Sequence, residues 1–167
     1  MHFPVADLHC DLLSFMAKVP KADPFDTSQI ACAFPWLRAG GVRAQVLAIY
    51  TDVHPESMVL ASRQGDLFVK LLEDHPETVC RWDAAFQQNL ETSEQLGIIA
   101  SIENADGIGT PTATWKEIYG QFDGLLEKVG SLAYISLTHH TENRFGGGNY
   151  TDGIGLKEDG KRLLDYL

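Results

Sequence analysis

The sequence predicts an α/β fold in which parallel strands alternate with helices. Four short, nearly continuous apolar runs, at residues 5–12, 42–50, 97–102 and 132–137, are typical of strands that are covered on both faces. The segments between and after them are longer, and their apolar residues recur with the period of a helix. Strands that alternate with helices form right-handed βαβ units, so the sheet is expected to be parallel.

The helical segments follow the strands in order. The first covers residues 55–74, where apolar residues such as Leu60, Leu67 and Leu71 form a broad stripe. Segments 83–96 and 115–129 show the same pattern, and Gly130 follows the second as a C-terminal cap. A last helix is expected from about Leu156 to the end of the sequence.

The number of these units predicts about half of a (β/α)₈, or TIM, barrel. Four strand–helix units are visible, whereas a complete barrel has eight in about 250 residues. We therefore expect residues 1–167 to form a single domain, the N-terminal half of such a barrel, which stops on a helix. A small doubly wound sheet is the alternative, but the Gly-rich phosphate loop that often marks that fold does not follow the first apolar run.

Composition excludes several classes of protein. The formal net charge of -10 disfavours binding to nucleic acid, and no segment approaches the ~20 apolar residues of a membrane-spanning helix. The three cysteines, Cys10, Cys32 and Cys80, lack CxxC spacing and are expected to be reduced thiols. Without a recognisable signal peptide, the sequence predicts a soluble, cytoplasmic protein with neither nucleic-acid nor membrane partners.

Polar side chains at the end of the first predicted strand suggest a metal site. Residues 7–11 read Asp-Leu-His-Cys-Asp, which places His9 and Asp11 two residues apart on one face of an extended chain. An imidazole beside a carboxylate suits a divalent cation, and Asp7 on the same face could support the ligands. A hydrogen-bonded His–Asp pair in a loop would give the same pattern.

Two later strands end in the same way. Glu103 closes an apolar strand, where a carboxylate is costly to bury unless it is paired or binds a cation. A glutamate that simply reaches solvent in the following loop would give the same pattern. The fourth strand leads to His139 and His140, whose side chains would point to opposite faces of a strand, so we expect one of them, His139, to face the site. Residues 143–148 then form a glycine-rich loop that could cover a small substrate or be a plain surface turn.

The chain also resembles the renal (membrane) dipeptidase family. The similar blocks occur in family order and span nearly the whole chain. They are the Asp-Leu-His-Cys-Asp-Leu segment at 7–12, the Leu-Arg-Ala-Gly-Gly-Val-Arg-Ala-Gln segment at 37–45, Ile102 with Glu103, the Ser-Leu-Thr-His segment at 136–139 with Asn143, and Gly155-Leu156 with Gly160.

The resemblance implies a zinc-dependent dipeptidase, a metallopeptidase in which a metal-bound hydroxide attacks the carbonyl of a dipeptide. His9 and Asp11 would ligate the first zinc, and Glu103 would bridge two zinc ions. His139 would be the catalytic imidazole that stabilises the carbonyl oxygen as it becomes an oxyanion, with Asn143 beside it in the substrate-binding set. Two metal ions polarise a carbonyl and hold a hydroxide at neutral pH, and a donor aimed at the developing charge adds stabilisation.

Part of the family's site is not found in this sequence. The histidines that bind the second zinc, the catalytic aspartate and the substrate-binding arginine lie on later strands of the family's barrel, so these residues support at most one zinc ion. We expect the isolated chain to hydrolyse dipeptides poorly or not at all with zinc present. The alternatives are a non-catalytic, self-associating remnant that binds one metal weakly, and another metal-dependent hydrolase on the same barrel.

The same half barrel predicts assembly with another chain. Its open strand edges and apolar inner face would be exposed in a monomer. We therefore expect either a homodimer that buries the inward residues of the segment 46–49, or association with a complementary C-terminal half. A monomer whose helices close the core is the competing expectation.

Overall fold

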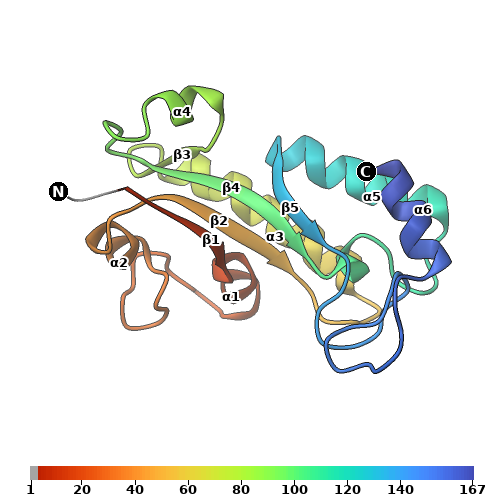
Figure 1. Ribbon diagram of the computed structural model, residues 1–167. Helices are drawn as coiled ribbons and strands as arrows, with labels where there is room; N and C mark the ends of the chain where they lie inside the picture. The colour runs from red at the N-terminus through yellow and green to blue at the C-terminus, as the bar shows by residue number, and fades with distance from the viewer. Residues whose placement is uncertain (1–3) are drawn as a thin grey trace.

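The computed structural model describes residues 4–167 and contains one parallel, curled sheet. The strands are β1 (Val5–Cys10), β2 (Val42–Tyr50), β3 (Val79–Arg81), β4 (Leu96–Glu103) and β5 (Leu132–Ser136). β2 pairs with β1 on one side and β4 on the other, while β3 and β5 both pair with β4. β3 pairs with the beginning of β4 and β5 with its end. The predicted α/β fold, half of a TIM barrel, is confirmed (Figure 1).

The helices connect the strands and flank the sheet. They are α1 (Leu12–Lys18), α2 (Phe34–Ala39), α3 (Ser57–Asp74), α4 (Ala84–Gln88), α5 (Trp115–Val129) and α6 (Glu158–Tyr166), with a 3₁₀ turn, η1 (Ala105–Gly107), after β4. The sequence predicted α3, α5 and α6 closely. α5 begins with a capping box between Thr114 and Glu117, and it ends at Gly130, whose φ of 83° is unfavourable for residues with a side chain.

Two predicted elements were wrong, and the short elements α1, α2 and β3 were not predicted. The run 5–12 is not one strand, because β1 ends at Cys10 and α1 begins at Leu12. Leu12 and Leu13 are fully buried, so the apolar run continues across the junction and hides it. The predicted helix at 83–96 contains only the five-residue α4, and β3 was missed because a three-residue strand has no readable period.

The sequence also led us to expect reduced cysteines and no membrane-spanning helix. Cys10, Cys32 and Cys80 are all free thiols. Among residues 4–167, no helix combines the length and the apolar character that a membrane span requires.

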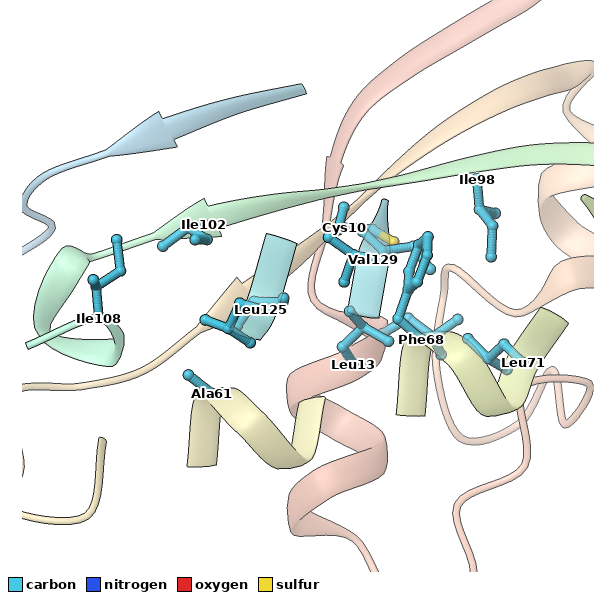
Figure 2. Close-up of a cluster of buried hydrophobic side chains, with 14 of the residues drawn as sticks. Cys10, Leu13, Ala61, Phe68, Leu71, Ile98, Ile102, Ile108, Leu125 and Val129 are labelled. Atoms are coloured by element: carbon cyan, nitrogen blue, oxygen red, sulfur yellow. The ribbon is translucent and has the colours of Figure 1, made fainter. Parts of the chain in front are cut away.

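The hydrophobic core lies between the sheet and the helices α1, α3 and α5. Figure 2 shows Ile98 of β4 pointing toward the Leu71 end of α3, while Ile102 lies further along β4, near Ile108; Phe68 and Leu71 of α3 belong to the same cluster. These side chains are at most 2% exposed. This convex face is therefore packed like the outer layer of a barrel.

The concave face of the sheet is more covered than the sequence suggested. Val46 and Ala48 alternate with core residues of β2, so they point to the concave side, yet both are fully buried. The expectation that segment 46–49 is exposed in the single chain was therefore wrong. The curled sheet brings side chains of the outer strands over its centre, as the Tyr134–Leu8 contact between β5 and β1 shows. Apolar side chains are exposed on the outer strand β1, where Val5 is 43% and Leu8 63% exposed.

Candidate metal centre

The carboxyl ends of the strands bring the predicted site residues together. His9 lies near the end of β1, Glu103 is the last residue of β4, and His139 follows β5. The carboxyl ends of parallel strands lie at one edge of the sheet, which is where barrels of this kind carry their active sites. The final residue of β2, Tyr50, is paired in register with Glu103 at the same edge.

His9, Asp11 and Glu103 form a compact group of potential ligands. One ligand atom from each residue lies within 4.8 Å of the other two. His9 Nε2 is 3.4 Å from Glu103 Oε2 and 3.8 Å from Asp11 Oδ1. The three residues come from two strand ends that are separated by β2 in the sheet.

This group fits a small divalent cation. Zinc binds imidazole nitrogen and carboxylate oxygen at about 2.0–2.2 Å, which places tetrahedral ligand atoms about 3.4 Å apart. The two distances from His9 Nε2 are close to that spacing. One nitrogen and two anionic oxygens also provide the charge and ligand types that zinc accepts.

The backbone around His9 departs from a regular strand. The register between β1 and β2 shifts between Asp7 and Cys10, so the simple alternation that placed Asp7 and His9 on one face does not hold. Asp7 Oδ1 instead accepts a hydrogen bond of 3.1 Å from the His9 backbone N–H. Asp11 is the N-cap residue of α1, but its side chain makes no capping hydrogen bond, which leaves its carboxylate available to the site.

Glu103 lies between two imidazoles. Its side chain is 18% exposed, and Oε1 is 3.4 Å from His139 Nε2 while Oε2 faces His9. Both contacts exceed the 2.7–3.2 Å of ordinary hydrogen bonds. A half-buried carboxylate with such loose partners is costly unless a cation joins it.

His139 and His140 have different surroundings, although the reasoning from strand alternation does not apply, because β5 ends at Ser136. His139 faces Glu103 and meets the ring of Tyr50 edge-on, with the ring centroids 5.1 Å apart. His140 stacks on Tyr150, with 4.7 Å between the ring centroids. His139 is therefore the histidine of this pair that contacts the candidate metal centre.

Tyr50 connects this centre with a cleft. Its hydroxyl donates a 2.5 Å hydrogen bond to Asp52. Burial, followed by this hydrogen bond, raises the pKa of Tyr50 above its usual value, so the hydroxyl stays protonated. The cleft has a volume of about 280 Å³ and lies between the end of α1 and the start of α3, where Lys18, Tyr50, Asp52, His54 and Glu56 contribute to its walls.

Asn143 makes its hydrogen bonds within the loop after β5 and to Asn104, which follows Glu103 in the chain. It is 4% exposed, and its side-chain N–H groups donate to Asn104 Oδ1 and to the Leu137 carbonyl, both at 2.7 Å. Its Oδ1 accepts hydrogen bonds from the backbone N–H groups of Phe145 and Gly146. These contacts hold the loop after β5, and a role of Asn143 in substrate binding stays a prediction.

Sequence reasoning missed Tyr50 and Tyr134. Tyr134 Oη lies 2.7 Å from His9 Nδ1, so both tyrosines contact a histidine of the site. Each belongs to an apolar run, where a tyrosine is usually part of the core. The one local signal was the position of Tyr50 as the last residue of its strand.

Comparisons with known proteins found a family model and solved structures that are similar to the chain. A family model described as membrane dipeptidase (peptidase family M19) matches residues 1–165. Twelve chains of solved structures match, among them a crystal structure described as the dipeptidase AC, a metallopeptidase of family M19. Its TM-score is 0.65 at 21% identity, and the alignment covers 99% of this chain and 54% of that chain. No curated protein sequence matches the chain.

Proposed function

Because the chain belongs to the membrane dipeptidase family, peptidase family M19, we propose that it contributes the first metal site of a zinc-dependent dipeptidase. His9, Asp11 and Glu103 would bind one zinc ion, and Glu103 would share its second oxygen with another. The observation that carries this proposal is the approach of these three ligand atoms within 4.8 Å of one another. A metal ion held in this way polarises a carbonyl and supplies a nucleophile from water at neutral pH.

The residues around the ligands support a small peptide substrate. In the proposal His139 donates a hydrogen bond to the carbonyl oxygen as negative charge develops on it. Contact with the Tyr50 ring and with Glu103 orients this imidazole. The cleft beside Tyr50 is of a size for one amino-acid residue, and its Lys18, Asp52 and Glu56 side chains offer charges that pair with the ends of a dipeptide.

The extent of the match limits what these residues do alone. The chain spans 54% of the length of the solved dipeptidase, and its described residues offer one cluster of three metal ligands. The ligands of a second zinc ion and the remaining catalytic groups would have to be supplied by further protein. We therefore propose that residues 1–167 by themselves bind zinc but turn over dipeptides slowly.

A non-catalytic, self-associating form of the protein is the second candidate. It is favoured by the apolar side chains of Val5 and Leu8, which remain exposed on the outer strand β1, and an outer strand can pair with another chain. In this case the partner would be a second copy, and zinc binding would be weak.

Two measurements on the purified chain test the first candidate. Zinc affinity is measured by competition with a chromophoric chelator for the wild type and for His9→Asn, Glu103→Gln and His75→Gln. The first two variants are expected to lose zinc binding, whereas His75→Gln, which changes a histidine at the end of α3 that packs on Phe25, is the matched control. Equal affinity in all four proteins would reject the site.

Dipeptide hydrolysis is then followed by the release of free amino acids in the presence of zinc. Ordinary enzymes turn over about 1–10³ times per second, and the isolated chain is expected to fall far below that range. Turnover within the range that is lost in Glu103→Gln would show that residues 1–167 already hold all the groups the reaction needs. Zinc binding with no hydrolysis at any zinc concentration would favour the non-catalytic candidate.

A further inference from the structure

Tyr134 crosses the concave side of the sheet to reach the first metal ligand. Its hydroxyl oxygen lies 2.7 Å from His9 Nδ1 and 3.1 Å from the Leu8 carbonyl oxygen. Tyr134 belongs to β5 and the other two residues to β1, and β2 and β4 separate these strands in the sheet. One side chain thus connects the two outer strands at the level of the candidate metal centre.

We propose that Tyr134 is a positioning residue that holds the His9 ring in the tautomer and orientation that metal binding requires. The inference rests on the proposed zinc site, because it assigns His9 Nε2 as the ligand atom. Tyr134 itself would touch neither the metal nor the substrate. Histidine ligands commonly donate their second ring N–H to such a partner, which fixes the tautomer and raises the basicity of the ligand nitrogen.

The hydrogen-bond donors and acceptors of His9, Tyr134 and Leu8 together favour one tautomer of the His9 ring. A tyrosine hydroxyl has a single proton, and the Leu8 carbonyl can only accept it. When Tyr134 donates to Leu8, its oxygen accepts from His9, so the proton of the neutral imidazole lies on Nδ1. The lone pair of Nε2 is then free and points toward Asp11 and Glu103.

The distances around the ring favour the same assignment. His9 Nδ1 and Tyr134 Oη are separated by 2.7 Å, a normal hydrogen bond, whereas Nε2 is 3.4 Å from Glu103 Oε2. In this tautomer the longer distance separates two groups that both bear lone pairs. A cation between them would satisfy both, so the ring is set for metal binding on the Nε2 side.

The position of Tyr134 also explains why a tyrosine of a distant strand serves this purpose. The hydroxyl contacts both the ring of His9 and the backbone of Leu8. Through these two contacts it acts on the irregular part of β1, where the register shifts between Asp7 and Cys10. In a regular strand, hydrogen bonds to the neighbouring strand would fix the position of His9. At the register shift in β1, the hydrogen bond to the Tyr134 hydroxyl fixes it instead.

The test compares Tyr134→Phe with Tyr166→Phe. Each substitution removes one hydroxyl from a tyrosine of similar exposure, 37% for Tyr134 and 38% for Tyr166, and each removes a hydrogen bond. The Tyr166 hydroxyl bonds to Asp123 at 2.8 Å on the outer helices. Tyr134→Phe is expected to weaken zinc affinity about 10–100-fold, whereas Tyr166→Phe leaves it unchanged. Equal zinc affinity in Tyr134→Phe and the wild type overturns the inference.

A spectroscopic readout separates positioning from a general loss of structure. In the histidine-¹⁵N-labelled chain, the two nitrogen shifts of the neutral His9 ring report its tautomer, and His9→Asn assigns the signals. The wild type is expected to carry the proton on Nδ1 with and without zinc, and Tyr134→Phe to populate the other tautomer without zinc. A wild-type ring protonated on Nε2, or the same tautomer in both proteins, overturns the inference.

These readouts distinguish the failure of this inference from the failure of the proposed function. If the wild type binds no zinc, the proposed zinc site fails, and the tautomer of the zinc-free chain still decides the role of Tyr134. If the wild type and Tyr134→Phe bind zinc equally, the zinc site stands and the positioning role fails. If Tyr134→Phe does not fold, the wild-type tautomer alone decides the inference.

Discussion

Different kinds of contact stabilise the two faces of the sheet. On the convex face, Phe68 of α3 packs with Ile98 of β4 in a continuous apolar core. On the concave side, the carboxyl edge depends on a few polar contacts, such as those of His9 with Tyr134 and with Glu103. The core contacts need apolar volume, whereas the polar contacts need particular atoms at particular distances.

This difference predicts where each kind of substitution acts. Many hydrophobic residues of similar volume maintain a core, because its contacts are non-directional. A hydrogen bond or a metal ligand tolerates a change of a few tenths of an ångström and a small set of residue types. Substitutions on the convex face should therefore alter the free energy of unfolding, and those on the concave side should alter binding and assembly.

The largest effect is expected for Phe68→Ala. Phe68 is fully buried between α3 and the sheet, and truncating a buried phenylalanine lowers the free energy of unfolding by about 3–5 kcal/mol. Urea denaturation of the zinc-free chain measures this loss. Val59→Ala on the same helix is the control, because Val59 is 70% exposed and its change should stay within about 0.5 kcal/mol. Similar losses in both variants would contradict the assignment of the core.

An intermediate effect is expected for added zinc. A ligand that binds the folded chain at about 100 times its dissociation constant raises the free energy of unfolding by about 2.7 kcal/mol. Glu103→Gln should abolish this gain while its zinc-free stability stays close to that of the wild type. The measurement is urea denaturation with zinc and with a chelator. A zinc-dependent gain that persists in Glu103→Gln would place the binding elsewhere.

The smallest effect on stability is expected for Leu8→Ser. Leu8 is 63% exposed on β1, so the substitution should alter the free energy of unfolding by no more than about 0.5 kcal/mol. If β1 pairs with a second chain, sedimentation at micromolar concentration should show the wild type as a dimer and Leu8→Ser shifted toward the monomer. Val59→Ser removes a similarly exposed apolar side chain from α3 and should leave the dimer intact. A wild type at monomer mass would reject self-association.

Local patterns in the sequence account for much of the fold. β2 was predicted with its observed bounds, because nine successive residues read as a covered strand that ends at Tyr50. α5 was predicted for a similar reason, since its apolar stripe ends at a glycine that has the left-handed backbone of a cap. The predicted ligands His9, Asp11 and Glu103 also came together, because they lie at or directly after the ends of β1 and β4, and the carboxyl ends of parallel strands share one edge.

The errors occur where a local pattern has two explanations. The apolar residues that follow β1 could extend a strand or begin a helix, and the turn at Asp11 carries no glycine or proline to mark it.

Gly97 makes a contact that no local sequence pattern could have predicted. A Cβ at Gly97 would lie 2.3 Å from the ring of Phe86 in α4, so this glycine makes room for a short helix on the concave side.

The sequence by itself determined the alternation of the longer strands and helices, their apolar faces and the polar residues that lie at or just after the ends of β1, β4 and β5. These properties depend on period and on residue type, which are local and can be read along the chain. Only the tertiary structure decided which side chains meet across the curled sheet. Tyr134 and His9 are 125 residues apart, and their contact depends on the pairing of four strands, on the register shift in β1 and on the curvature of the sheet. Each of these arises from many weak contacts at once, so no single segment encodes the position of the tyrosine hydroxyl.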